Sequence, residues 1–195
     1  MDESNNISQQ ANETGEVSLP LWGALHDADL RRIAADPMAR TAMLVFEIEH
    51  LREFAGLPSG VTWRLVVHSA SMLLARGWEV WRGPAPKLNG LSHEKQKALV
   101  AEYQAKGRTV SVAWSGFEQT VSANGLWIAD ATLNQRTADV ILEGFGHDKE
   151  TDVLYEFKLV GGQLQCERSD RHQTSIEDLL RLGEAYWKAF SENAG

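Results

Sequence analysis

Two short apolar segments, 139–145 and 152–160, constrain the fold of this chain more than any other feature. Both are rich in Val, Ile, Leu, Phe and Tyr, the residue types that favour β-strands. The six residues between them, 146–151, are mostly polar and have the composition of a turn. The sequence therefore predicts a β-hairpin.

The second arm of this hairpin carries two charged residues, Glu156 and Lys158, among apolar neighbours. Side chains alternate between the two faces of a strand, so Glu156 and Lys158 should point to the same side, opposite Phe157. Apolar neighbours on both faces are typical of a strand that is covered on both sides. Burying a carboxylate and an ammonium is costly unless they pair or bind a metal.

Asp139 begins the first arm and can approach the same end of the sheet if the two arms pair. Two carboxylates and a lysine would then converge on one point. Mg²⁺ is commonly held by one or two carboxylates together with waters and phosphate oxygens, and a bound cation makes hydroxide accessible at neutral pH. We therefore expect a site for a divalent cation, Mg²⁺ or Mn²⁺, at this point.

At these residues the sequence resembles the PD-(D/E)xK nuclease superfamily. The segment 136–142 stands where that family has its "PD" strand, with Ala138 in place of the proline, and Glu156-Phe157-Lys158 stands as its E-x-K motif. The resemblance implies that Asp139 and Glu156 bind the metal and that Lys158 is the catalytic lysine. It also implies an α/β fold with a restriction-endonuclease-like central mixed β-sheet flanked by α-helices. The E-x-K strand followed by a helix is loosely similar to the nuclease domain of McrC-like restriction subunits.

Turn and cap residues divide the rest of the chain into expected elements. Asp36, Pro37 and Gly56, for example, are typical of the start and end of a helix. The expected helices are 27–35, 37–55, 61–76, 92–105 and 175–190, and the further strands are 78–81, 109–114, 125–129 and 163–166. A strand over 63–67 is an alternative within the third helix.

Four further polar residues are candidates for the same site. Many members of the superfamily bring an acidic residue from a helix ahead of the sheet, and Glu47 lies at the edge of an apolar helix face, although it can equally be a boundary glutamate in water. Gln173 is the candidate from the segment after the E-x-K strand. Arg168 and Arg171 are candidates for holding a substrate phosphate, and ordinary surface charge is their alternative.

Composition limits the possible functions. The net charge of −8 argues against a free-standing nucleic-acid binder. It does not exclude a nuclease, because metal-site carboxylates count as negative until the ion binds and a protein partner could supply most of the DNA contacts. The single Cys166 excludes an internal disulfide, and no segment has the length of a membrane span or a signal peptide. We expect a cytoplasmic protein with a disordered polar tail over 1–18 and one domain over 19–195.

Three functions remain open from the sequence. The first is a metal-dependent nuclease that hydrolyses phosphodiester bonds of nucleic acid, with DNA as the expected substrate, in restriction, defence or repair, and that can act as a homodimer. The second is an inactive member of the same fold that binds a partner or nucleic acid without cutting it. The third is an unrelated α/β binding protein, such as an immunity or antitoxin-like protein, in which Glu156 and Lys158 form a structural ion pair.

Overall fold

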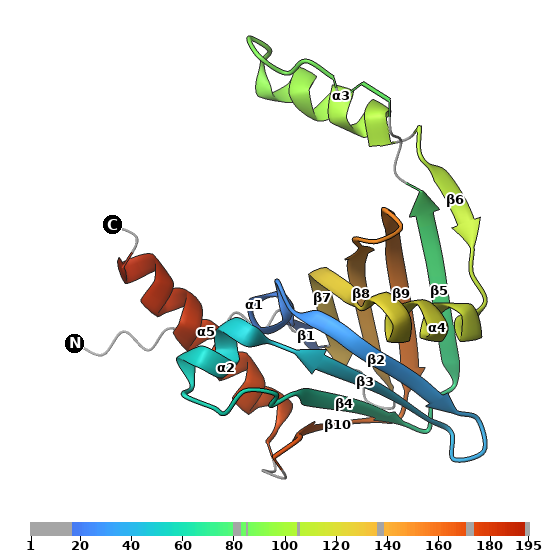
Figure 1. Ribbon diagram of the computed structural model, residues 1–195, viewed down its shortest axis with the longest axis vertical. Helices are drawn as coiled ribbons and strands as arrows, with labels where there is room; N and C mark the ends of the chain where they lie inside the picture. Colours follow the sequence, from blue (N-terminus) through green and yellow to red (C-terminus); the bar gives the residue numbers. More distant parts are fainter. Residues whose placement is uncertain are drawn as a thin grey trace.

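One large antiparallel sheet dominates the chain (Figure 1). The computed structural model describes residues 17–79, 83–84, 86–104, 106–135, 139–170 and 174–193. Within these ranges ten strands pair in the order β10-β4-β3-β2-β7-β8-β9-β5-β6, with β1 added to β7, and every pairing is antiparallel. The elements are β1 (Val17–Pro20), α1 (Trp22–Leu25), β2 (Asp29–Asp36), β3 (Thr41–Glu47), α2 (Glu49–Phe54), β4 (Trp63–His68), β5 (Met72–Glu79), α3 (His93–Gln104), β6 (Arg108–Ser111), α4 (Trp114–Asn124), β7 (Leu126–Gln135), β8 (Val140–Asp148), β9 (Val153–Gly161), β10 (Gln163–Arg168) and α5 (Ile176–Asn193).

The sheet turns a corner where β4 continues into β5 and β9 continues into β10. On one side of the corner β4 pairs with β10, and on the other side β5 pairs with β9. Gly161 makes the close approach at this corner possible, because a Cβ there would lie 2.4 Å from Cγ1 of Val67. The corner divides the sheet into one half with β10, β4, β3 and β2 and another with β7, β8, β9, β5 and β6.

The hydrophobic core lies between these two halves, and α4 packs into it. Phe117 on α4 is fully buried, and its ring contacts those of Tyr155 and Phe157 on β9. On the other side of α4, the Glu118 carboxylate accepts a hydrogen bond from the backbone N–H of Ala35 on β2. The helix therefore joins both halves of the sheet.

The helices α1, α2 and α5 add buried side chains to this core, among them Leu25, Leu51 and Leu179. α5 packs on α1 so closely that a Cβ at Gly183 would be 2.5 Å from the carbonyl oxygen of Gly23, and the Trp187 indole donates a hydrogen bond to that same oxygen. α3 belongs to the connection between β5 and β6 and projects away from the body (Figure 1). No helix of the described residues has the length and apolar character needed to span a membrane.

Several sequence predictions are confirmed. The hairpin is β8 and β9, the return strand is β10, and the predicted helices over 92–105 and 175–190 are α3 and α5. Ser175 and Asp178 form the reciprocal hydrogen bonds of a capping box at the start of α5. The chain combines helices and a sheet as expected, but the expectation of a mixed sheet is wrong for the described strands, which pair only in antiparallel fashion.

Three predicted helices in the first half of the chain are wrong. The ranges 27–35, 37–55 and 61–76 contain β2, β3, β4 and most of β5, with only the short α2 as a helix. Along β3 the buried side chains alternate, as a half-buried strand requires, and the alternative strand over 63–67 is the one observed. Apolar residues at 44, 48 and 51 fit helical spacing as well, and tertiary pairing decided between the two periods.

Two residues that flank predicted helices in this region have other roles. Asp36 accepts hydrogen bonds from the N–H groups of Met38 and Ala39, so it shapes the turn between β2 and β3 instead of capping a helix. Gly77, which follows the predicted helix over 61–76, lies inside β5, where a Cβ would be 3.3 Å from Val112 and Val153. α4 was not predicted, and most of the tail predicted over 1–18 lies outside the described residues.

Candidate binding site on the open sheet face

The strands β7, β8, β9 and β5 have one face against α4 and one face turned away from it, which we call the open face. On β9, Tyr155, Phe157 and Leu159 are buried on the packed side, whereas Glu156 and Lys158 point to the open face as predicted. The expectation that both faces would be covered is wrong, because Glu156 is exposed and Lys158 is half-buried. The strand is therefore half solvated.

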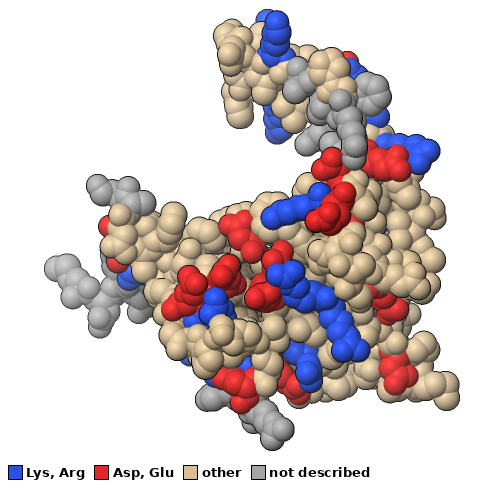
Figure 2. Space-filling model, in the orientation of Figure 1, with Lys and Arg blue, Asp and Glu red and all other residues tan. Residues whose placement is uncertain are grey.

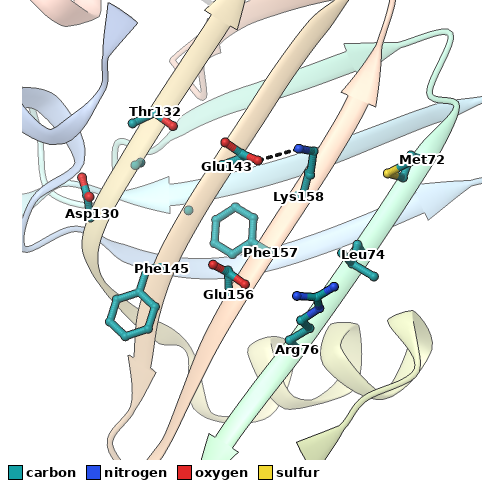
Figure 3. A pocket seen from close by; sticks show the side chains of 12 residues that line it. Met72, Leu74, Arg76, Asp130, Thr132, Glu143, Phe145, Glu156, Phe157 and Lys158 are labelled. Carbon is teal, nitrogen blue, oxygen red and sulfur yellow. Dashed lines mark hydrogen bonds and ion pairs between the residues drawn. The ribbon is translucent and has the colours of Figure 1, made fainter. Parts of the chain in front are cut away.

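The open face is hollowed by a cavity of about 580 Å³ (Figure 3). All its lining residues come from the four strands, and none comes from a helix. Five of them are charged and two are aromatic: Arg76, Asp130, Glu143, Glu156, Lys158, Phe145 and Phe157. The hollow thus offers groups of both charge signs and an apolar surface.

Lys158 pairs with a residue that the sequence analysis did not select. Its ammonium donates a hydrogen bond of 2.7 Å to the carboxylate of Glu143, which lies directly across from it on β8 (Figure 3). The two side chains are 34% and 40% exposed, so the ion pair is only partly shielded from water. The structural pair between Glu156 and Lys158 that the third alternative includes is absent from the described contacts, and Glu143 takes the place of Glu156.

A row of side chains crosses the open face beside this ion pair. The register places Asp130 opposite Phe145, Phe145 opposite Glu156, and Glu156 opposite Arg76, on four successive strands. Neighbouring strands are about 4.8 Å apart, so these groups are within reach of one ligand. Among the described residues, neither the two carboxylates of this row nor its guanidinium has an ion-pair or hydrogen-bond partner. The row therefore carries three charged groups that have no ion-pair or hydrogen-bond partner among the described residues.

The predicted metal ligands are far apart. Asp139 precedes Val140, which pairs with Gly161, whereas Glu156 pairs with Phe145 near the other end of the hairpin. At about 3.3 Å per residue, this register separates Asp139 and Glu156 by about 20 Å along the strands. No group of three or more His, Cys, Asp or Glu side chains with the spacing of a metal site occurs in the described part of the chain. The Asp139 and Glu156 pair therefore does not fit one Mg²⁺ ion.

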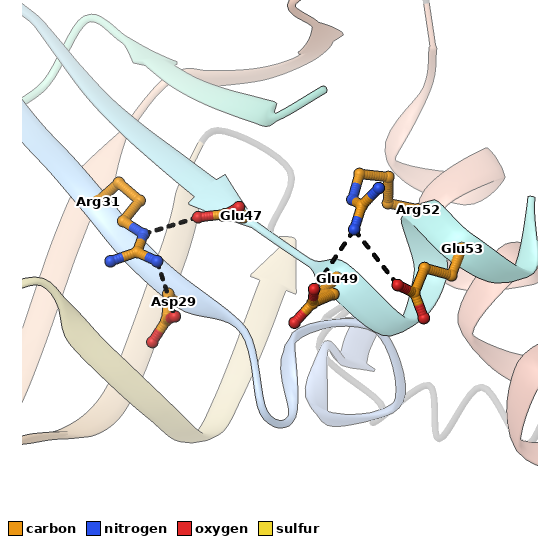
Figure 4. Close-up of polar contacts among 6 residues, drawn as sticks. All are labelled: Asp29, Arg31, Glu47, Glu49, Arg52 and Glu53. Carbon is orange, nitrogen blue, oxygen red and sulfur yellow. Dashed lines mark hydrogen bonds and ion pairs between the residues drawn. The ribbon is translucent and has the colours of Figure 1, made fainter. Parts of the chain in front are cut away.

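Glu47 lies in the other half of the sheet, at the end of β3 instead of on a helix. Its carboxylate accepts a hydrogen bond of 2.8 Å from Arg31, whose guanidinium also lies 3.2 Å from Asp29 (Figure 4). Acidic and basic side chains are intermixed on the molecular face that Figure 2 shows, without a region of one sign covering it. Glu47 therefore belongs to a surface ion-pair network away from the open face.

The remaining predicted residues lie at or beyond the end of β10. Arg168 makes two hydrogen bonds to Asp170, of 2.8 and 3.1 Å, so its guanidinium already has a partner. Arg171 and Gln173 lie outside the described residues. The structure does not bring Arg168 to the hollow, whose lining residues all come from β5, β7, β8 and β9.

One structural carboxylate was missed by the sequence analysis. Asp148, at the end of β8, is fully buried and accepts hydrogen bonds from the side chains of Asn124 and Thr151 and from the N–H groups of Glu150 and Thr151. Burial alone would raise the pKa of Asp148, but these hydrogen bonds outweigh it and hold the pKa below its ordinary value. Its position in the polar hexapeptide marked it only as a turn residue.

A cluster of aromatic rings holds α5 against α1 and α2. Trp187 stacks on Trp22 at 5.5 Å, and His50 lies 4.7 Å from Tyr186. Burial lowers the pKa of His50, an effect that Asp27 opposes and His26 reinforces, and His50 Nε2 has no hydrogen-bond partner among the described residues. Trp22 and Trp187 therefore serve in packing.

Comparisons with known proteins give no family for this chain. No family model matches the sequence, and no curated protein sequence is significantly similar to it. Among solved structures, an uncharacterized protein from Neisseria gonorrhoeae aligns with 78% of this chain and 96% of its own, at 9% identity and a TM-score of 0.37.

Proposed function

We propose that this protein binds a partner polypeptide through the open face, as the immunity or antitoxin-like alternative from the sequence implies. The observation that carries the proposal is the row of unpaired charges, Asp130, Glu156 and Arg76, around Phe145. Charged groups without partners in the free protein are available to pair with groups on a second molecule. An aromatic anchor in a hollow, surrounded by polar groups, is typical of the energetic centre of an interface.

The composition of the hollow also favours a protein partner. Two apolar side chains at its margin, Met72 and Leu74, are 50% and 38% exposed. Met, aromatic residues and Arg are enriched at protein interfaces relative to the remaining surface. The net charge of −8 and the two unpaired carboxylates favour a partner segment with basic side chains.

Selection of peptides tests this function. A displayed library of random dodecapeptides is selected on the wild-type protein, and the affinities of enriched peptides are then measured by titration calorimetry. We expect enriched peptides to contain Lys or Arg and to bind at least tenfold more weakly to Glu156→Gln and to Phe145→Ala. Glu53→Gln, on the exposed surface of α2, is the matched control and should bind as the wild type does.

The contrary outcomes are specific. Enrichment of no sequence, or peptides that bind the open-face variants and the wild type equally, would remove the open face as the binding surface. Loss of binding in the Glu53→Gln control would move the site to α2.

Metal-dependent nuclease activity with a restriction-endonuclease-like fold is the second candidate. It is favoured by one observation, that Glu156 and Lys158 share the hollow with the carboxylates of Glu143 and Asp130. The distance between Asp139 and Glu156 and the antiparallel pairing of every described strand count against it.

Metal titration separates the two candidates. A ligand that binds only the native state stabilises it by about 2.7 kcal/mol at a hundredfold excess over its Kd. If the nuclease proposal holds, millimolar Mg²⁺ or Mn²⁺ should raise the Tm of the wild type but not of Glu156→Gln, and the wild type should cleave DNA or RNA. If the metal does not change the Tm of either protein and the substrates stay intact, the nuclease proposal is wrong and only the binding proposal remains.

A further inference from the structure

β5 leaves part of one edge without a strand. On one side β9 pairs with all of Met72–Glu79, but on the other side β6 pairs only with Arg76–Glu79. No strand of the described residues pairs with this second side of Met72–Ala75. Beyond Ser111 the chain leaves the sheet for α4, so β6 does not extend along this edge.

An unpaired edge of this kind is a template for another strand. Alternate residues direct their N–H and C=O groups sideways, and only an extended backbone satisfies such a row fully. Proteins commonly protect exposed edges with charged residues or proline. The segment 72–75, Met-Leu-Leu-Ala, contains neither, and Met72 and Leu74 are exposed.

Two hollows meet at this edge. The cavity of the open face reaches Met72 and Leu74, and a second hollow of about 550 Å³ is lined by Met72, Leu73 and residues of the β2–β3 turn such as Arg40. Side chains of an added strand alternate between the two faces of the sheet. Successive residues of that strand would therefore be directed toward one hollow and then the other.

We propose that Met72–Ala75 binds an extended segment of a partner protein by β-strand addition. The inference rests on the proposed function and specifies how the partner is held: its backbone pairs with β5, and its apolar side chains pack on Met72 and Leu74. On the open face Lys158 lies across from Leu74, and Glu156 lies two residues further along, across from Arg76, so a basic side chain can approach Glu156 only at the Arg76 end of the added strand.

A foreign segment fits this edge better than a second copy of the chain. The free edge is four residues long, bounded by Ser111 at one end and by the corner of the sheet at the other. Pairing of two such short edges would bury much less surface than the roughly 1,200 Å² or more of a stable interface. A flexible segment can pair with the edge and also fill both hollows, which gives it a larger contact.

Scanning the peptide backbone tests the proposal. An enriched dodecapeptide from the selection is synthesised with a single N-methyl group at each position in turn, which removes one backbone donor and leaves every side chain in place. We expect at least tenfold losses of affinity at every second position over four to five residues. Within residues 72–75, amide exchange should slow on binding at the alternate residues whose N–H groups face the free side, whereas that of residues 76–79, already paired on both sides, should change little.

Two lysine substitutions, one on each of two strand edges, test the proposal from the side of the protein. Leu74→Lys places a charge on the free edge of β5, and Gln163→Lys places the same charge on β10, the other edge of the sheet. We expect at least tenfold weaker peptide binding for Leu74→Lys and unchanged binding for Gln163→Lys, with both variants folded by circular dichroism.

The outcomes distinguish this inference from the proposed function. Peptides that depend on Glu156 and Phe145 but show no two-residue period and no slowing of exchange at 72–75 would overturn strand addition and leave the open-face function standing. Selection of no peptide at all would overturn both. A two-residue period with unchanged binding to Leu74→Lys would place the added strand on another edge.

Discussion

The two faces of the β8–β9 hairpin contrast sharply in how their polar groups are satisfied. On the packed side, the buried Asp148 has a hydrogen-bond donor for each of its oxygens. On the open side, Glu156 has no described partner, although Arg76 lies directly across from it. Because side chains alternate along a strand, one residue can stabilise the fold while its neighbour in sequence is available for binding. We expect substitutions on the packed face to lower the free energy of unfolding and substitutions on the open face to weaken peptide binding.

The largest difference should appear between two phenylalanines. Phe157→Ala removes a side chain that is 2% exposed from the packed face and should lower the free energy of unfolding by about 3–5 kcal/mol. Phe145→Ala, on the half-buried open face, should cost about 1 kcal/mol or less while weakening peptide binding. Urea denaturation of both variants measures the contrast, and equal losses of stability would erase it.

Asp148→Ala should rank second, with a loss of about 2–3 kcal/mol, because several buried donors lose a charged acceptor. The pKa of Asp148 is lower in the folded than in the unfolded chain, so the carboxylate contributes stability above the ordinary pKa of 3.8. That contribution is lost as the pH falls below this value toward the folded pKa.

Unfolding free energies measured between pH 7 and pH 2 check the sign of this effect. The difference between the wild type and Asp148→Asn should shrink as the pH falls. A difference that stays constant with pH would show that the carboxylate charge contributes nothing.

The ion pair between Glu143 and Lys158 should contribute less, because both side chains are more than a third exposed. A double-mutant cycle with Glu143→Gln and Lys158→Met should give a coupling energy of about 1 kcal/mol or less that decreases as salt is added. A larger, salt-independent coupling would place the pair with the packed face instead of the open one.

Glu156→Gln should have the smallest effect on stability, within about 0.5 kcal/mol of the wild type, because the carboxylate is exposed and has no described partner. The same substitution should reduce binding of selected peptides at least tenfold, as measured by calorimetry. Arg76→Gln is the companion variant on β5. A marked loss of stability in either variant would show that the row is structural.

The second half of the fold was more predictable than the first for a physical reason. The hairpin of β8 and β9 and the helix α5 are local structures whose turn and cap residues lie next to the segments that they join. β3 and β4 also pair with their neighbours in the chain, but Asp36 and Pro37, which lie in the turn between β2 and β3, are equally typical of the start of a helix. The apolar residues of β3 and β4 fit both the 3.6-residue period of a helix and the two-residue period of a strand, and the helix prediction was wrong.

The candidate site was predictable only in part. Alternation along the strand placed Glu156 and Lys158 on one face correctly. The contributions of Glu143, Asp130 and Arg76 depend on the register of β8, β7 and β5, which the sequence alone does not specify. One choice of ligand, Asp139, rested on the resemblance, and the observed register moves that residue to the far end of the hairpin.

The corner of the sheet also bears on how the chain acquires its structure. Ser71 Oγ bonds to the carbonyl of Val160, 89 residues away in sequence, and the β4–β10 pairing spans a similar interval. Pairings between such distant segments must overcome a large loop-closure entropy, and chains dominated by them fold in milliseconds to seconds. During synthesis, β4 and β5 emerge long before β10 and β9. The nascent first half therefore carries unpaired strand edges until the last third of the chain is made, a period in which a chaperone would be expected to cover them.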